Sequence, residues 1–176
     1  GLARCGFIAI EIIDSFVREK VLSHKEKYDF LNSISTISTE LANDYVKLNK
    51  SKFISKYGHL RPGTYDINSS RYDHNEEFYL KNSIGKNLIN NYNYSLDSWN
   101  NEKKKFMNEL NLMDLPFEGK FVEEFLYKSI EGREYAKFIF TKNLSDALEE
   151  IVLAFKQFGL SRDDLSNLDL MTLINV

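Results

Sequence analysis

The sequence predicts an all-α protein, an irregular helical bundle of about six helices with one long ordered loop over residues 58–73. Two observations favour helices: apolar residues recur at helical spacing along most of the chain, and only two prolines interrupt 176 residues. Thirteen Phe and ten Tyr supply large side chains for a core. Because the chain opens in a helical pattern without an initiator Met, we expect a single helical domain, residues 1–176, cut from a larger multidomain protein.

The first helix is expected over residues 5–17. Its apolar residues cover so much of the circumference that we expect it to be central and nearly surrounded. Ser23 and Glu26 have the spacing of a capping box, which predicts the start of a second helix. Apolar residues continue at helical spacing from there, so one long helix is predicted to reach Leu48. A short helical turn is expected over residues 53–57.

The second half of the chain begins with residues 82–97, which are rich in Asn and are predicted to be a mobile insertion. A helix is expected over residues 116–142, with Gly132 marking close packing or a kink. Ser145 is expected to cap a further helix. Ser161 begins a pattern that resembles a capping box, so the C-terminus is predicted to form two short helices.

Composition argues against two classes of protein. The 23 Lys and Arg are interleaved with 26 Asp and Glu, so the chain lacks the basic stripe that neutralises nucleic-acid phosphates. No apolar run approaches the roughly 20 residues that cross a bilayer, so no membrane span is expected. The single cysteine, Cys5, cannot close an intramolecular disulfide, which favours a cytoplasmic location.

Residues 57–67 concentrate two of the eight glycines and one of the two prolines. The glycines permit a positive φ or a close approach of the backbone. Arg61 and Arg71 can grip a carboxylate or a phosphate with paired donors. Asp66 and Asp73 can instead bind these arginines internally, so that the loop staples helices together. The residues alone leave both interpretations open.

The histidines do not identify a site by their spacing. His59 can serve as a general base, a phosphoryl acceptor or a hydrogen-bonded loop residue. His74 lies next to Asp73 and close to Glu76 and Glu77, but this spacing does not make the ligands converge, and no metal site is predicted. The chain contains no Walker phosphate loop, serine-hydrolase elbow or zinc-protease helix motif.

Two stretches carry a resemblance to a known family. The first is Phe53-x-x-x-Tyr57-Gly58-His59-Leu60-Arg61-Pro62-Gly63-Thr64-Tyr65-Asp66-Ile67, followed by Ser70-Arg71-Tyr72-Asp73. The second is Gly132-Arg133-Glu134-Tyr135-Ala136-Lys137-Phe138 and the residues up to Ser145, with Gly159-Leu160-Ser161-Arg162-x-Asp164-Leu165-Ser166 behind it. They resemble the central helical region of the phosphoenolpyruvate-utilising phosphotransferases, the relatives of phosphoenolpyruvate synthase, pyruvate phosphate dikinase and rifampicin phosphotransferase.

The resemblance implies a parent protein with three parts: an ATP-grasp domain that binds ATP and Mg²⁺, a swivelling phosphohistidine domain, and a region that meets the acceptor. ATP would be split to AMP and phosphate, with one phosphoryl group passing through the histidine to a substrate. This chain would be the acceptor-binding or linking domain, with no cofactor of its own. Its partners would be the other two domains and, where it binds one, a small-molecule acceptor.

No catalytic residue can be carried over, because none of the three histidines has the Thr- and Gly-rich context of the carrier histidine. Two alternatives remain open: a non-enzymatic helical protein-interaction module whose first helix docks a partner, and a small-molecule hydrolase that uses His59 and Asp66. The candidate ligand-binding or domain-interface residues are His59, Arg61, Gly63, Tyr65, Asp66, Arg71, Tyr72 and Arg133.

Overall fold

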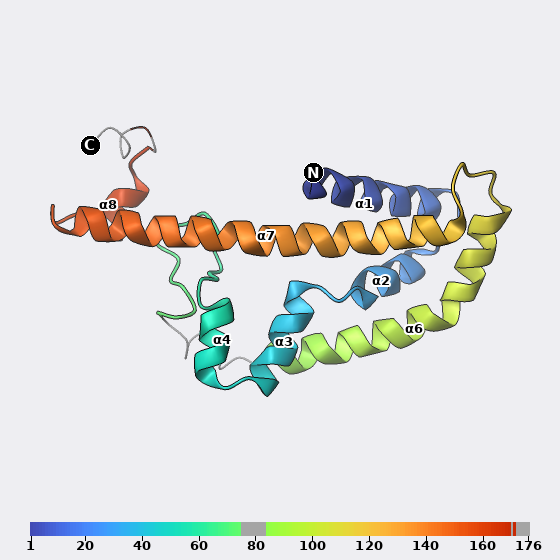
Figure 1. The fold of residues 1–176 in the computed structure, drawn as a ribbon, viewed down its shortest axis with the longest axis horizontal. Helices are drawn as coiled ribbons and strands as arrows, with labels where there is room; N and C mark the ends of the chain where they lie inside the picture. Colours follow the sequence, from blue (N-terminus) through green and yellow to red (C-terminus); the bar gives the residue numbers. More distant parts are fainter. Residues whose placement is uncertain (75–83, 170, 172–176) are drawn as a thin grey trace. The chain divides into compact units, whose positions relative to one another are not determined.

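A computed structural model describes residues 1–74, 84–169 and 171, with the backbone alone over 84–91. All the regular secondary structure of these residues is helical, which confirms the predicted all-α fold class. Figure 1 shows the seven helices of this part of the chain: α1 (Leu2–Arg18), α2 (His24–Ser33), α3 (Ile37–Lys47), α4 (Lys50–Tyr57), α6 (Ile84–Leu112), α7 (Gly119–Lys156) and α8 (Arg162–Ser166).

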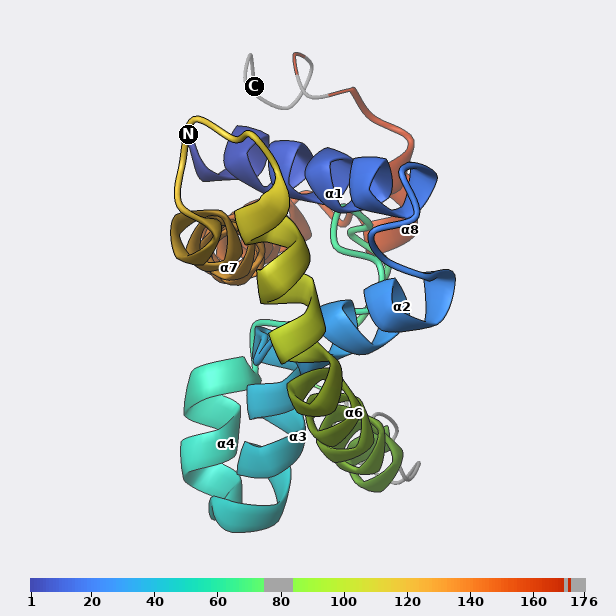
Figure 2. The same ribbon diagram turned by 90° about the vertical axis from the view of Figure 1, so that its right-hand side faces the viewer.

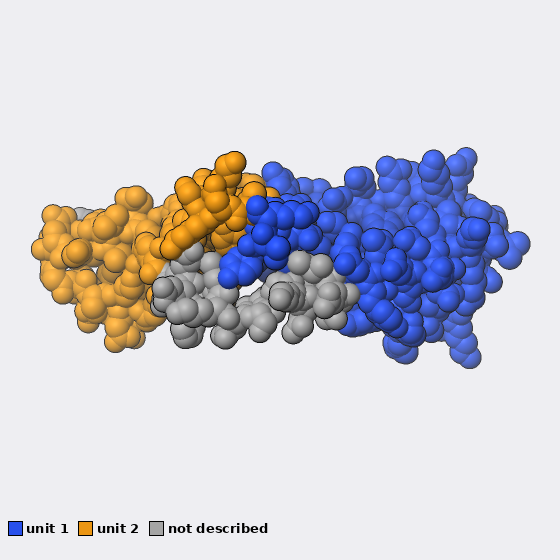
Figure 3. Space-filling view, turned by 90° about the horizontal axis from the view of Figure 1, so that it is seen from below, with its two compact units in different colours: residues 1–47, 83–137 blue, residues 48–82, 138–176 orange. Residues whose placement is uncertain are grey.

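The chain divides into two compact units, coloured blue and orange in Figure 3. Unit 1 comprises residues 1–47 and 83–137, and unit 2 comprises residues 48–82 and 138–176. The boundary falls within α7, so each unit receives one part of that helix. The expectation of a single excised domain stays a prediction.

Unit 1 is held together by an apolar core, and within this unit α2 and α3 both pack on α6 (Figure 2). Trp99 of α6 is fully buried, and its ring lies 4.9 Å from that of Phe30 and 5.3 Å from that of Phe106. The contact with Phe30 is edge-to-face and that with Phe106 is tilted, and such aromatic contacts add to the burial of large apolar surface. Ile13 of α1 and Leu126 of α7 complete the centre of this core.

The prediction that the first helix is nearly surrounded was wrong. α1 buries one face, with Ala9 and Ile13 fully covered, while Phe7 and Ile8 are 63% and 52% exposed. The hydrophobic content of a helix predicts that it has a buried face, but it does not reveal how many neighbours surround it.

The long helix predicted after Ser23 is two helices. The capping box of Ser23 and Glu26 is present, as predicted, but α2 ends at Ser33 and α3 begins at Ile37. The Ser33 hydroxyl donates to the Phe30 carbonyl, and Ile34 takes an extended backbone that buries its side chain in the core. A serine hydroxyl that binds the preceding turn and a β-branched residue both weaken a helix locally. Together with the burial of Ile34 in the core, they account for the end of α2 at Ser33.

α6 begins at Ile84, so most of the segment predicted to be a mobile insertion is helical. Ser95 and Trp99 in this helix are buried, because the apolar face that starts there joins the core of unit 1. Residues 82 and 83 lie outside the described residues. The predicted mobility itself stays a prediction.

α7 is one helix through two positions where the sequence predicted an interruption. Gly132 lies inside it, and a Cβ atom at this position would come within 3.2 Å of a Leu2 methyl group, which confirms the close packing expected there. Ser145 is 2% exposed in the interior of the helix and does not cap a new one. Its hydroxyl is used by the loop of unit 2, as described below.

The end of the described chain follows the predicted signals. Gly159 has a φ of 74°, the left-handed conformation that ends helices. Ser161 and Asp164 form a reciprocal capping box at the start of α8. The second C-terminal helix that the sequence predicts falls largely outside the described residues.

Candidate functional site

The loop over residues 58–73 is irregular but extensively hydrogen-bonded. Its two ends are joined, because the Tyr72 amide donates to the Leu60 carbonyl at 2.8 Å and the Asp73 amide donates to the Gly58 carbonyl at 3.1 Å. A turn in the middle is closed by a hydrogen bond from the Asp66 amide to the Gly63 carbonyl. Such internal pairing gives the backbone a defined path without a helix or a strand.

The two glycines of this loop allow close contact and do not adopt a positive φ. A Cβ atom on Gly58 would lie 2.5 Å from the Ile54 carbonyl oxygen, and one on Gly63 would lie 2.9 Å from the Cβ of Asp66. Of the two roles that the sequence left open for these glycines, the structure therefore supports the close backbone approach.

Arg61 is buried between the loop and α7, with a side chain that is only 2% exposed. Its Nη2 donates to a Glu149 carboxylate oxygen at 2.7 Å, and its Nε and Nη2 donate to the Ser145 hydroxyl at 3.1 and 3.0 Å. A third nitrogen, Nη1, donates to the Asp66 carbonyl. All these acceptors belong to unit 2, so the guanidinium group is satisfied within the fold.

Arg71 is likewise satisfied inside unit 2. It forms a two-point contact with the Asp73 carboxylate, at 3.0 and 2.8 Å, and its remaining Nη1 donates to Asp146 of α7 at 2.7 Å. Burial alone would lower the pKa of Arg71, but the hydrogen bonds to Asp73 and Asp146 outweigh it and raise the pKa. Both arginines are thus bound internally, as the staple interpretation requires. The carboxylate that pairs with Arg71 is the predicted Asp73, whereas Arg61 pairs with Glu149 and not with the carboxylate of Asp66.

Glu149 is the centre of this network, and the sequence did not reveal it. Arg162 of α8 donates to the same carboxylate, at 2.5 Å to Oε2, and also to the Ile67 carbonyl of the loop. Burial would raise the pKa of Glu149, but the hydrogen bonds from Arg162 and Arg61 lower it. One carboxylate thus joins the loop, α7 and α8.

A signal for these partners is present in the sequence. Thr141, Ser145 and Glu149 recur every four residues, so they share one face of α7. A polar stripe that is buried needs partners from another segment. The stripe predicts neither the partner nor its distance along the chain, and Arg61 lies 84 residues from Ser145.

His59 is 4% exposed, with its ring centroid 4.8 Å from that of Phe138. Its Nε2 atom has no hydrogen-bond partner among the described residues. Burial, followed by the positive charges of Lys142 and Arg71, lowers the pKa of His59. These surroundings favour the neutral ring.

Each of the other candidate residues has its own surroundings in the described part of the chain. Tyr65 is 75% exposed, and the Asp66 carboxylate accepts from the Asn68 amide within its own turn. Tyr72 contributes its backbone amide to the pairing of the loop ends. Arg133 is in unit 1, where its guanidinium group lies 4.9 Å from the centre of the Phe7 ring.

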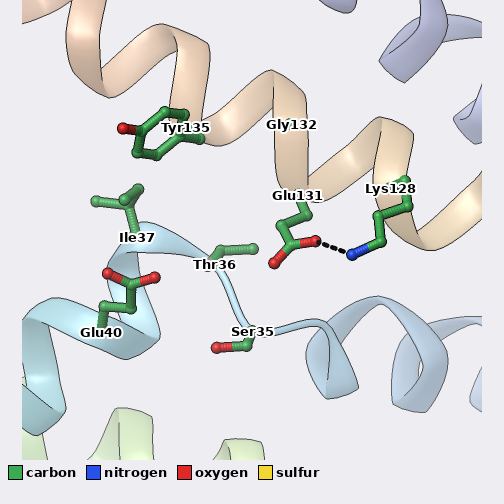
Figure 4. Close-up of a pocket in the computed structure, with 8 residues that line it drawn as sticks. All are labelled: Ser35, Thr36, Ile37, Glu40, Lys128, Glu131, Gly132 and Tyr135. Carbon is green, nitrogen blue, oxygen red and sulfur yellow. Dashed lines mark ion pairs between the residues drawn. The ribbon is translucent and has the colours of Figure 1, made fainter.

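A shallow pocket of about 250 Å³ in unit 1 lies between the link that joins α2 to α3 and the middle of α7 (Figure 4). Thr36 and Ile37 come from the link and the start of α3, and Tyr135 comes from α7. Lys128 and Glu131 on the α7 side form an ion pair at 3.5 Å, and both are largely exposed. None of the candidate residues named from the sequence lines this pocket.

Among the described residues there is no group of three His, Cys, Asp or Glu side chains arranged to hold a metal ion. Glu76 and Glu77, considered with His74 as ligands, lie outside the described residues. In the same part of the chain, no helix has the length and apolarity needed to span a membrane. Comparisons with protein-family models, with curated proteins and with solved structures return no match for this chain.

Proposed function

We propose that this chain is a helical linking domain of a phosphoenolpyruvate synthase-like, ATP-dependent phosphotransferase, and that it is not catalytic alone. The proposal takes the family from the resemblance of residues 57–73 and 132–145. ATP and Mg²⁺ belong to the parent protein, and the partners are its ATP-grasp and swivelling phosphohistidine domains. Linking is favoured over acceptor binding by the way in which the arginines of the loop are used.

The observation that carries this choice is the buried guanidinium group of Arg61. Its donors reach Ser145, Glu149 and the Asp66 carbonyl, all within hydrogen-bond distance. A phosphate or carboxylate ligand would have to displace Glu149 from a site where the arginine side chain is 2% exposed. The ligand would have to replace this internal ion pair and its hydrogen bonds at a desolvated site, which is unfavourable, so the contacts favour a loop that holds helices together.

The experiment that separates linking from acceptor binding uses Arg61→Ala in the parent protein. A staple predicts that the melting temperature falls while the rate of AMP formation per folded molecule, measured well below that temperature, stays within about twofold of wild type. Arg18→Ala is the control, because Arg18 forms an exposed ion pair with Glu11. A rate loss of about tenfold or more at an unchanged melting temperature would contradict linking and favour acceptor binding.

A second experiment tests whether the chain is catalytic alone. Incubated with ATP and Mg²⁺, the isolated chain should form no AMP and transfer no phosphoryl group, because phosphoryl transfer requires metal and cationic clamps around an in-line geometry. Turnover that disappears in His59→Gln would contradict the proposal and favour the hydrolase alternative.

A second candidate function, the protein-interaction module, is favoured by the exposed apolar surface of α1. Leu2, Phe7 and Ile8 are each at least half exposed. Exposed apolar side chains of this size are a feature of protein contact surfaces. Replacing Phe7 and Ile8 by Ser should then weaken binding to a purified partner domain by about tenfold or more, whereas Tyr65→Ser in unit 2 should not. Equal binding by both variants would exclude α1 as the docking face.

A further inference from the structure

His59 is the one histidine of the described chain that is buried, and its surroundings suit only the neutral ring. The ring is in contact with Phe138 on one side, and its Nε2 atom has no acceptor within reach. A proton added at Nε2 would create a buried N–H⁺ donor with nothing to accept it. Burying an unpaired charge is among the least favourable changes that a fold can undergo.

The charges around this ring also oppose a proton. Lys142 of α7 and Arg71 of the loop face it with positive charge, and both lower its pKa, after the larger effect of burial. Asp146 of α7 and a hydrogen bond with the Phe138 backbone act in the opposite direction but do not outweigh them. The pKa in the folded state is therefore below its ordinary value of 6.5.

The backbone of His59 also takes part in the hydrogen bonds that attach the loop to α7. The Ser145 hydroxyl donates to the His59 carbonyl at 2.7 Å, and the same hydroxyl accepts from Arg61. The Gly58 carbonyl, one residue earlier, accepts from the Asp73 amide that closes the loop. A movement that carried the ring out of its site would therefore disturb the Arg61 contact and the closure of the loop together.

We propose that protonation of His59 releases residues 58–73 from α7, so that the attachment of this loop responds to pH. The direction follows from the linkage between proton binding and stability. The folded state disfavours a proton on His59. The contribution of the neutral ring to the stability of the folded loop is therefore complete above pH 6.5 and is lost as the pH falls below it. This regulation is independent of the proposed linking function and does not require any parent domain.

His74 supplies a matched control in the same unit. Its side chain is half exposed, and its ring nitrogens lie 3.7 Å from an Asp73 oxygen and 3.9 Å from a Glu149 oxygen. Because the ring of His74 is open to solvent and that of His59 is buried, only protonation of His59 should open the loop.

The test is a pH titration of the full chain from about pH 7.5 to about pH 5, which stays above the range in which Glu149 titrates. Nuclear magnetic resonance follows the ring protons of His59 and the hydrogen-exchange protection factors of the Tyr72 and Asp73 amides. We expect the His59 midpoint to lie below 6.5 and the two protection factors to fall about tenfold or more with that midpoint, while amides of α6 keep theirs.

His59→Gln should abolish the pH dependence of the two protection factors, and His74→Gln should leave it as in the wild type. If His59→Gln does not fold, the titration of the wild-type ring still decides the matter. A His59 midpoint at or above 6.5, constant protection factors down to pH 5, or an equal loss of protection in α6 would each overturn the proposal.

Discussion

The two units of this chain are stabilised in different ways. Unit 1 surrounds Trp99 with the rings of Phe30 and Phe106, so its stability comes from apolar burial. Unit 2 attaches an irregular loop to α7 through a charged pair, the buried Arg61 and the partly buried Glu149. An apolar core depends on shape and volume, whereas a desolvated ion pair depends on the presence of both charged partners.

The largest effect is expected in the apolar core. Trp99→Ala should destabilise unit 1 by about 4 kcal/mol, because it removes a fully buried side chain and leaves a cavity among aromatic rings. Chemical denaturation, monitored in each unit by the hydrogen exchange of its backbone amides, measures the loss of stability in that unit. An equal loss of protection in the loop of unit 2 would show that the two units unfold together, and the contrast between them would fail.

The corresponding test in unit 2 is Arg61→Ala, which should lower the free energy of unfolding by about 3 kcal/mol and abolish protection of the loop amides. The expected size reflects a Glu149 carboxylate left without one of its two arginines in a site that is 14% exposed. Arg18→Ala, which breaks an exposed pair, should change stability by about 0.5 kcal/mol or less. Equal losses in these two variants would refute the special role of Arg61.

The helix caps and the polar loop differ in how far the sequence predicts them. Both partners of the Ser23 and Glu26 box lie within one turn, so local spacing was sufficient. Ser145 has the same residue type as a helix cap, but its hydroxyl binds the His59 carbonyl, 86 residues earlier in the chain. Local patterns therefore predicted the fold class and the caps at Ser23 and Ser161, while the role of Ser145 and the partner of Arg61 required the tertiary structure.

Ser145→Ala sharpens this distinction. It should destabilise unit 2 by about 2 kcal/mol, because the His59 carbonyl loses a donor and Arg61 loses an acceptor in a buried site. A residue that merely capped a helix would instead affect the residues just after it. Hydrogen exchange distinguishes the two outcomes, since loss of protection confined to amides after 145 would contradict the role assigned here. Ser129→Ala, at a buried serine of unit 1, is the control for loss of a hydroxyl.

Acid should weaken unit 2 further through Glu149. Its pKa is lowered in the folded state by Arg162 and Arg61 against the effect of burial, so its stabilisation is complete above the ordinary value of 4.5 and is lost as the pH falls below it. The slope of stability against pH in this range should be shallower in Glu149→Gln than in the wild type. Identical slopes would show that the carboxylate is not held as described.

The smallest effect is expected at Gly132, where α7 packs against α1. Gly132→Ala should stabilise unit 1 by about 0.5 kcal/mol, because alanine favours a helix interior and the Leu2 methyl group at 3.2 Å belongs to a half-exposed, flexible side chain. A loss of about 1 kcal/mol or more in thermal unfolding would show that the contact with Leu2 is rigid.

The most direct test of the contrast between the units is a double-mutant cycle on Arg61 and Glu149, with each residue replaced by Ala singly and together. Denaturation of the four proteins gives the interaction energy between the two side chains. If unit 2 is held by this buried pair, the coupling should be about 2 kcal/mol or more. A coupling within about 0.3 kcal/mol of zero would show that the two changes are independent and would contradict the account.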